Sequence, residues 1–273
     1  MTRGKALLPL LYSAAAALFV TAVLVPQLAY EEIMSDVSSW SSFFTVFGVV
    51  YAIVVGFLLA AVLTRYGTLT QAIESELNAI ECIRDFLTYF DESQAEPKRT
   101  IQIALYGYAQ SISDTEWQEM SQPRTQVNSD TSEQLYELMR ACRNLNAEAE
   151  IEHLALSAIV DNVSEIAKMR TRRICLANEQ LPPRLRLLVF FMSIVLVVGF
   201  AVMGVANPWI HALILVSISV SVHLLSMVLD DLDHPFYGVW NIDKSALDEL
   251  TQRFAGERDQ YRPDRAETDS PDR

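Results

Sequence analysis

Residues 43–65 form an apolar segment, FFTVFGVVYAIVVGFLLAAVLTR, whose only charged side chain is the last one, Arg65. A helix of this length crosses a hydrocarbon core of about 30 Å, because each helical residue adds about 1.5 Å. No turn follows the segment, and residues 68–90 continue with apolar side chains at helical spacings of three and four. The sequence therefore predicts one helix that crosses a membrane and continues into water.

Three further segments are long and apolar enough to span a membrane, at residues 6–25, 187–205 and 209–229. Each is close to the roughly 20 apolar residues that a transmembrane helix needs. A cleaved signal peptide is the alternative for residues 6–25. However, this apolar run is longer than the usual signal core of about 7–15 residues, and no clear cleavage site follows it. We therefore predict four transmembrane helices.

The remaining sequence has the periodicity of helices and no alternating strand pattern, so the predicted fold is all-α. Helices are predicted at residues 68–90, 97–117, 132–145 and 147–178. The resulting organisation has the first two spans in residues 1–67, a helical cytoplasmic section in 68–182, the last two spans in 183–238 and a C-terminal tail in 239–273. From residue 256 onward the tail is polar and contains two prolines, which predicts partial disorder.

The placement of lysine and arginine predicts the orientation in the membrane. Residues 26–42 and 206–208, which join the spans in pairs, contain neither residue type. The opposite ends of the spans are flanked by Arg3, Lys5, Arg65, Arg184 and Arg186. Because positive flanks stay in the cytoplasm, both termini and the 68–182 section are predicted to be cytoplasmic. The chain is then a multi-pass protein of a plasma membrane, and its cysteines are reduced.

Composition and motifs argue against several function classes. A net charge of −13 is unfavourable for binding nucleic acid. The four histidines are scattered, and there is no C-x-x-C pair, phosphate-binding glycine loop, dinucleotide fingerprint or G-x-S-x-G motif. We therefore predict no enzyme activity, no cofactor and no metal site. His211 and His223 in the last span are interpreted as separate interhelical hydrogen bonders.

Val49, Ile53 and Phe57 follow one another at intervals of four residues and so form an apolar strip along one face of the second span. If several copies of this helix surrounded an axis, the strip would form a narrow constriction that gates by dewetting. Alternatively, the strip packs against neighbouring helices or lipid. On spacing alone, packing is favoured.

Three aspartates, Asp230, Asp231 and Asp233, follow the last span. Carboxylates so close together can bind a cation such as Ca²⁺. They can equally form a solvated exit from the membrane, with Pro235 ending the helix. Because no further ligands stand at defined offsets, we favour the solvated exit.

Two motifs resemble those of the bestrophins. Gly56-Phe57, separated by six residues from Thr64-Arg65-Tyr66, resembles their pore-helix pattern. The segment His234-Pro235-Phe236-Tyr237-Gly238 is similar to their Pro-Phe-Gly segment after the final span, with Tyr237 inserted. Over residues 5–250 the chain resembles the bacterial bestrophin-like family more closely. Its further marks are Glu76, Glu116, Trp117, Arg170, Arg173, Leu181, Pro182, Asp233, His234, Pro235 and Phe236.

This resemblance implies a homo-oligomeric channel, with five subunits, for small inorganic anions such as chloride. The second span would line the pore, with its neck at Val49, Ile53 and Phe57. In animal bestrophins the acidic run follows the Pro-Phe-Gly segment, whereas here it precedes it, so calcium gating is not expected. Glu31 and Glu32, near the predicted outer mouth, are unusual for an anion path.

A second hypothesis comes from a different class of protein. The chain would be a membrane-anchored sensor or scaffold that does not conduct ions and that binds a partner through its cytoplasmic helices. The oligomeric state separates the two hypotheses, because a stable monomer cannot surround a pore.

Overall fold

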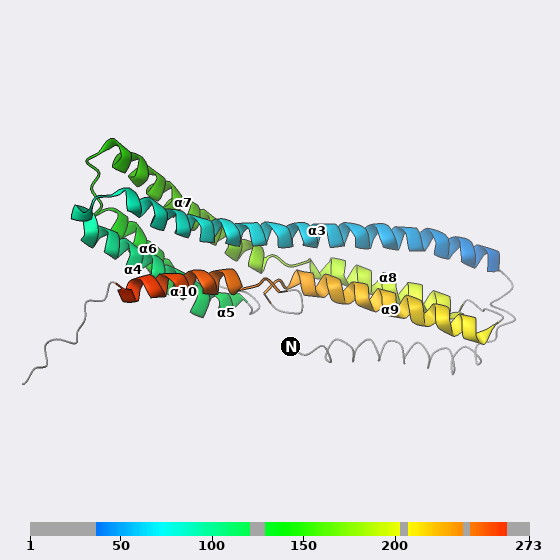
Figure 1. Cartoon of the computed structure of the whole chain (residues 1–273). Helices are drawn as coiled ribbons and strands as arrows, with labels where there is room; N and C mark the ends of the chain where they lie inside the picture. The colour runs from blue at the N-terminus through cyan, green and yellow to red at the C-terminus, as the bar shows by residue number, and fades with distance from the viewer. Residues whose placement is uncertain (1–36, 121–128, 203–206, 237–240, 261–273) are drawn as a thin grey trace, which may run out of the picture. The chain divides into compact units, whose positions relative to one another are not determined.

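The computed structural model describes residues 37–120, 129–202, 207–236 and 241–260, and within these ranges the chain forms helices and no strand (Figure 1). The chain divides into two compact units. The first combines residues up to Tyr66 with Gln180–Asn241, and the second combines Gly67–Glu179 with the residues from Ile242 onward. The predicted first span, the glutamates Glu31 and Glu32, and the motif residues Tyr237 and Gly238 lie outside the described residues.

The helix α3 runs without interruption from Val37 to Phe86. It contains no proline, and its apolar and small residues are compatible with helix throughout. The predicted continuation of the second span into a further helical segment is therefore confirmed. The boundary between the two units falls within α3, between Tyr66 and Gly67.

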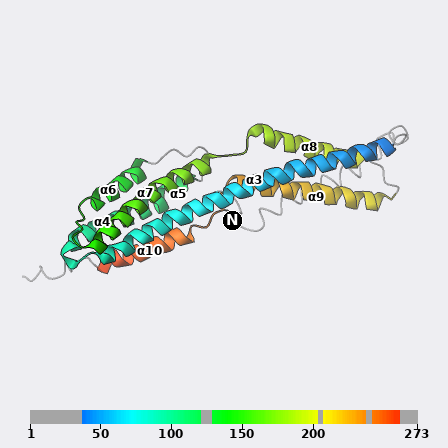
Figure 2. The same cartoon turned by 90° about the horizontal axis from the view of Figure 1, so that it is seen from above.

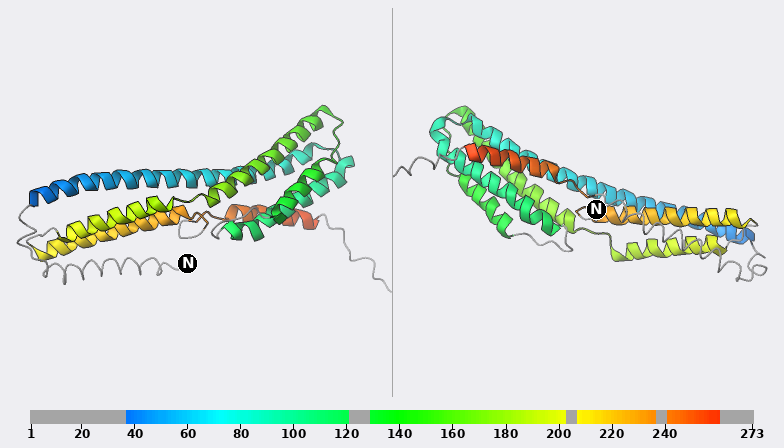
Figure 3. Two further views of the ribbon diagram at one scale, coloured as in Figure 1. Left: turned by 180° about the vertical axis from the view of Figure 1, so that it is seen from behind. Right: turned by 60° about the horizontal axis from the view of Figure 1, so that its bottom comes forward.

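The first unit contains three described helices: the early part of α3, α8 (Pro183–Val202) and α9 (Pro208–Asp233). All three are long and apolar enough to cross a membrane. The helices α8 and α9 lie side by side in both views of Figure 3. Their shared core with α3 contains Tyr51, Val55, Leu58, Val62, Val189, Met192, Leu229 and Leu232. The α3 members of this core recur at helical spacing, so one face of the span packs against other helices of the same chain.

Local sequence explains where α8 and α9 begin. Each has proline in its first turn, where the missing N–H costs no helical hydrogen bond. Asn207 caps α9, because its side-chain oxygen accepts hydrogen bonds from the backbone N–H groups of Trp209 and Ile210. His211 is buried in the first turn of α9, and its Nε2 lies 3.1 Å from the carbonyl oxygen of Phe200 on α8. The predicted interhelical role of His211 is thus confirmed.

Close packing of α3 against α8 depends on Gly199. A Cβ atom built at this position would overlap the ring of Phe44, which is buried. The Phe44 ring also lies 5.9 Å, centroid to centroid, from the ring of Phe200. The absence of a side chain at Gly199 therefore makes room for an aromatic ring from α3.

In its described residues, the second unit is a bundle formed by the later part of α3 and five further α-helices. These are α4 (Ala95–Ser111), α5 (Trp117–Met120), α6 (Ser129–Cys142), α7 (Glu150–Asn178) and α10 (Ser245–Gln260). Short 3₁₀ turns at Leu87–Tyr89 and Glu92–Gln94 precede α4, and a π-helical turn at Ile112–Glu116 joins α4 to α5. Figure 2 shows α4, α6 and α7 running alongside one another. The predicted helices of this section are confirmed, with ends shifted by a few residues.

The core of the second unit follows the predicted apolar stripes. Ile80 and Ile83 of α3 share this core with Leu87 of the following 3₁₀ turn. Their partners include Ile101, Leu105 and Tyr108 of α4 and Ile159 and Ile166 of α7. Helix α10 was not predicted. It buries Leu247, Leu250 and Phe254 in the same core, so this part of the predicted tail, which precedes the stretch predicted to be disordered, is a bundle member.

Glu152 fixes the start of α7. Its carboxylate accepts hydrogen bonds from the backbone N–H groups of Glu148 at 2.8 Å, Ala149 at 3.0 Å and Asp91 at 3.3 Å. These donors, Ala149 first and Glu148 next, lower the pKa of Glu152. The carboxylate therefore stays ionised under mildly acidic conditions and keeps capping the helix.

Candidate functional site

The predicted neck residues form an exposed strip on α3. Val49, Ile53 and Phe57 are 56%, 53% and 74% exposed, while the opposite face of the helix is buried against α8 and α9. A Cβ atom at Gly56, beside Phe57, would meet no atom within 4 Å. The three side chains are thus brought together on one face, and this face is open to lipid, to another subunit or to a pore.

Arg65, the only charged residue of this span, does not lie on the exposed strip. It follows Leu58 by seven residues and therefore belongs to the buried face of α3. Its side chain is 10% exposed. Its Nη2 donates to the Oδ1 atom of Asp233 at 2.9 Å and to the carbonyl oxygens of Asp233 and Leu232 at 2.9 and 3.3 Å. These carbonyls end α9, where the helix dipole favours a cation.

Asp233 is the centre of this ionic cluster, and its side chain is 0% exposed. Besides Arg65, its Oδ1 accepts a hydrogen bond from the backbone N–H of Leu181 at 2.9 Å. Its Oδ2 accepts one from Nη2 of Arg186 in the first turns of α8, at 2.6 Å. We call these residues, Arg65, Leu181, Arg186 and Asp233, the Asp233 cluster. A single carboxylate thus joins α3, α8, α9 and the segment before α8.

The other motif residues after the last span are placed differently. Asp230 is exposed, and its Oδ1 lies 3.6 Å from Nη2 of Arg186. The backbone carbonyl oxygen of Asp230 lies 2.9 Å from Nδ1 of His234. Asp231 and Phe236 are half-buried, and Pro235 is buried. α9 ends at Asp233, before Pro235, as predicted. The interpretation of the acidic run as a solvated exit is wrong for Asp233, because two guanidinium groups and a backbone N–H enclose its carboxylate.

A cation site is not formed by these aspartates. Among the residues that the structure describes, no group of three or more His, Cys, Asp or Glu side chains is arranged to hold a metal ion. The positive charge beside Asp233 comes from Arg65 and Arg186 of the same chain. The two guanidinium groups therefore neutralise Asp233 at the place where a bound cation would otherwise be needed.

A second buried ionic cluster lies in the second unit. Arg173 of α7 donates through Nε to Glu76 of α3 at 2.7 Å and through Nη2 to Glu116 at 2.7 Å. Arg170 donates to Glu116 at 2.7 Å. The hydroxyl of Tyr108 donates to Glu76 at 2.6 Å. We call these five residues the Arg173 cluster, and it links α3, α4, the π-helical turn and α7.

The Arg173 cluster is electrically balanced, with two carboxylates facing two guanidinium groups. Burial first, and then the charge of Glu76, raises the pKa of Tyr108 well above its usual range, so its hydroxyl remains a donor. Burial alone lowers the pKa of Arg173, but the carboxylates of Glu76 and Glu116 outweigh this effect and raise it. Tyr108 and Arg173 therefore keep their protons through the physiological range, and the hydrogen bonds between the charged groups tie α3, α4, the π-helical turn and α7 together.

The π-helical turn at Ile112–Glu116 contacts two neighbouring helices, α7 and α10. Its wider turn places both Ser113 and Glu116 in buried positions. Ser113 donates to the carboxylate of Asp248 on α10 at 3.1 Å, while Glu116 accepts from α7. The C-terminal helix and α7 are thus both attached to this turn.

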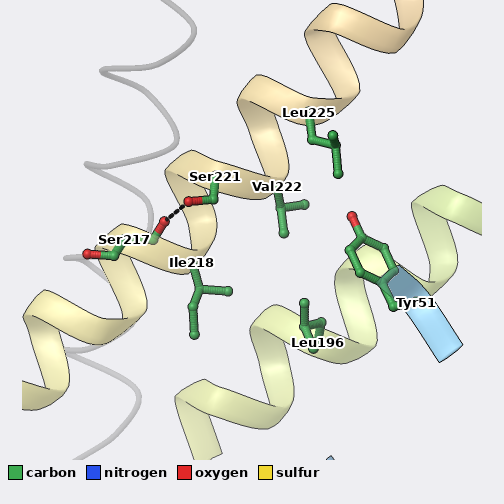
Figure 4. A pocket seen from close by; sticks show the side chains of 7 residues that line it. All are labelled: Tyr51, Leu196, Ser217, Ile218, Ser221, Val222 and Leu225. Carbon is green, nitrogen blue, oxygen red and sulfur yellow. Dashed lines mark hydrogen bonds between the residues drawn. The ribbon is translucent and has the colours of Figure 1, made fainter. Parts of the chain in front are cut away.

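The first unit also contains a pocket of about 300 Å³ (Figure 4). It is lined by Tyr51, Leu196, Ser217, Ile218, Ser221, Val222 and Leu225. Ser217 and Ser221 donate to backbone carbonyls of their own helix, and the hydroxyl of Tyr51 pairs with Ser193 at 3.1 Å. None of the seven lining side chains is charged, and the hydroxyls of Ser217, Ser221 and Tyr51 are all engaged in hydrogen bonds within or between the helices.

Comparison with known proteins identifies the family of this chain. A model of the bestrophin-like domain matches residues 10–247. The chain belongs to the bestrophin-like family. No curated protein matches this bestrophin-like chain significantly.

Solved structures share the fold of this bestrophin-like protein. A variant of a bacterial bestrophin homologue from Klebsiella pneumoniae is 13% identical, with a TM-score of 0.74 over 90% of this chain and 98% of that one. Another variant of that homologue is 14% identical, with a TM-score of 0.72 over 93% and 98% of the two chains. A crystal structure titled only as a membrane protein gives 13% identity and a TM-score of 0.73 over 92% and 99%. At such low identity these likenesses show the fold alone.

The residues that carried the resemblance to the bestrophin-like family fall largely into the two ionic clusters. Glu76, Glu116, Arg170 and Arg173 meet in one, and Leu181 and Asp233 meet in the other. Trp117 instead packs partly buried against the core of the second unit. Sequence analysis did not identify Tyr108 or Arg186 as cluster members. A usable signal was the presence of charged residues at core positions of an apolar helical stripe, as at Glu76 and Arg173.

Proposed function

We propose that this bestrophin-like protein is an oligomeric ion channel whose pore is lined by α3. The observation that carries the proposal is the exposed apolar strip on a transmembrane helix whose other face is already packed. Contiguous exposed apolar surface of this kind is available for assembly around an axis. Family resemblance suggests five subunits and small inorganic anions such as chloride.

In this channel Val49, Ile53 and Phe57 form the neck. Uncharged apolar side chains act as a steric and dewetting barrier and contribute little to the choice between ions. Arg65 cannot supply that choice within the span, because it is turned to the buried face and paired with Asp233. Ion preference therefore arises outside the neck.

The neck is tested by replacing Val49, Ile53 and Phe57 together with alanine and recording the purified oligomer in planar bilayers. Single-channel conductance should rise, because the constriction widens, and the reversal potential should stay the same. Assembly should be retained, since pore-facing side chains make few packing contacts. A matched control replaces Leu187, Phe190 and Ile194, three exposed apolar residues of α8, and should leave conductance unchanged.

Other outcomes would contradict the proposed neck. If the strip packed between helices, each substitution would remove buried volume at a cost of about 1–5 kcal/mol, and the oligomer would lose stability without gaining current. If the wild type and the variant both assembled and neither conducted, the channel function would be refuted. The membrane-anchored scaffold would then be the better hypothesis.

In the proposed orientation the protein lies in a bacterial inner membrane, with both termini and the second unit on the cytoplasmic side. Labelling intact cells with an impermeant maleimide tests it. Cys175, exposed in the second unit, should react only after permeabilisation, whereas a Ser39→Cys variant should react at once. Burial raises the pKa of Cys142 to about 11, so this thiol should stay unlabelled in the folded protein. Reaction of Cys175 in intact cells would reverse the orientation.

A further inference from the structure

We propose that Asp233 is a positioning residue for the pore-lining helix: by binding Arg65, it fixes the rotation of α3 about its own axis and so sets how often the channel is open. The inference rests on the proposed channel function. It assigns regulation to an ionic cluster that lies apart from the neck residues.

The geometry gives Asp233 control over α3 because the contact is directional. Arg65 reaches Asp233 through Nη2, which also donates to two carbonyl oxygens at the end of α9. These acceptors define one position for the guanidinium group. Hydrogen bonds to charged groups weaken steeply when their angles change, whereas apolar contacts tolerate sliding.

The packing around Arg65 at this level of α3 includes apolar contacts. Near Arg65 the helix contacts its neighbours through Val62 and Tyr66, among partners that include Leu181, Leu229 and Leu232. These contacts are non-directional, because burial of apolar surface depends on area and not on orientation. The hydrogen-bonded charge pair is therefore a directional contact that defines the rotational position of α3 at Arg65, and the hydrogen bond between Tyr51 and Ser193 is a second one, 14 residues earlier in the helix.

Rotation at Arg65 also moves the neck, because both belong to one helix. Arg65 lies eight residues, just over two turns, beyond Phe57. A rotation that carries Arg65 away from Asp233 turns the strip through a similar angle. Since the strip points away from the α8–α9 side and Arg65 points towards it, an intact contact holds the strip in one direction.

The second guanidinium makes Asp233 the critical member of the pair. Its carboxylate is fully buried and faces both Arg65 and Arg186. Loss of its charge leaves Arg65, whose side chain is 10% exposed, without its carboxylate partner and close to the like charge of Arg186, which is costly in a poorly solvated site. The expected response is displacement of Arg65, and with it of α3.

The test records single channels of the purified full-length oligomer carrying Asp233→Asn, Arg65→Gln or both. Each single substitution should change the open probability about tenfold or more, because each removes a buried hydrogen bond between charged groups. Conductance and reversal potential should stay unchanged, since neither side chain lies on the strip. The double variant should match one of the single variants, because both remove the same contact.

Two further variants keep the test decisive. Asp230→Asn alters an exposed carboxylate next to the cluster and should leave the open probability unchanged. Arg65→Lys keeps the charge, and so favours folding if Asp233→Asn fails to assemble. It cannot reproduce the contacts of the guanidinium group and should still shift the open probability.

The outcomes separate this inference from the channel proposal. If the wild type conducts and the assembled Asp233→Asn and Arg65→Lys channels open as often as it does, the positioning role is refuted and the channel stands. If the substitutions change conductance or reversal potential, Asp233 or Arg65 lies in the ion path and the positioning role is likewise refuted. If the wild type does not conduct, both proposals fall.

Discussion

Replacing Arg173 with methionine should lower the free energy of unfolding of the second unit by about 3–5 kcal/mol, the usual effect of removing one partner from a buried ion pair. The Arg173 side chain is 1% exposed and contacts both carboxylates of its cluster. Without it, Glu76 keeps the hydroxyl of Tyr108 but loses its opposite charge. The midpoint of thermal unfolding of the detergent-solubilised protein should fall by roughly 10 °C or more.

Two companion variants test the cause of this loss. Arg172→Met changes the neighbouring residue, which is exposed, and should leave the midpoint almost unchanged. Adding Glu76→Gln to Arg173→Met removes the unpaired buried charge and should recover part of the stability. If Arg173→Met unfolds at the same temperature as the wild type, water reaches the carboxylates and the cluster is not a buried tie.

The second large effect is expected at Gly199. Alanine at this position introduces a Cβ atom that overlaps the ring of Phe44, so α3 and α8 must separate or the ring must leave its buried site. Overpacking of this kind typically costs about 1–3 kcal/mol. The measurement is the thermal midpoint of the detergent-solubilised protein, which should fall.

A second-site change provides the matched test. Phe44→Leu in the Gly199→Ala background makes room for the new methyl group, and the double variant should be more stable than Gly199→Ala alone. Gly48→Ala adds a methyl group where no atom lies within 4 Å and should be neutral or slightly stabilising, because alanine favours helix over glycine. If Gly199→Ala and Gly48→Ala lowered the thermal midpoint equally, the loss of glycine flexibility in the helices, and not the contact with Phe44, would determine the change in stability.

Features that depend on neighbouring residues were predictable from the sequence. The apolar run at 43–65 and the stripe through Ile80 and Ile83 each repeat within a few turns, so their helices and buried faces follow from local periodicity. The exposed face of α3 could be described in the same way. Its role could not, because one sequence does not specify how many copies of a helix meet.

The two ionic clusters were beyond local analysis, because their partners are far apart in sequence. Arg173 is 97 residues from Glu76, and Arg65 is 168 residues from Asp233. Charge type and spacing along one helix do not indicate which distant residue will be opposite. Helix α10 was missed for another reason: its Leu247, Leu250 and Phe254 form a correct stripe, but the surrounding residues are so polar that composition outweighed periodicity.

The separation of Arg65 from Asp233 also has a consequence for biogenesis. At about 5–20 residues per second, the ribosome needs on the order of 10–30 s to synthesise the 168 residues between them. Throughout that interval the span that ends at Arg65 has already been made, while its counter-ion does not yet exist. Arg65 must therefore be accommodated by water, lipid headgroups or the insertion machinery until the last span arrives. Truncation before Asp233 would leave this arginine permanently without that counter-ion.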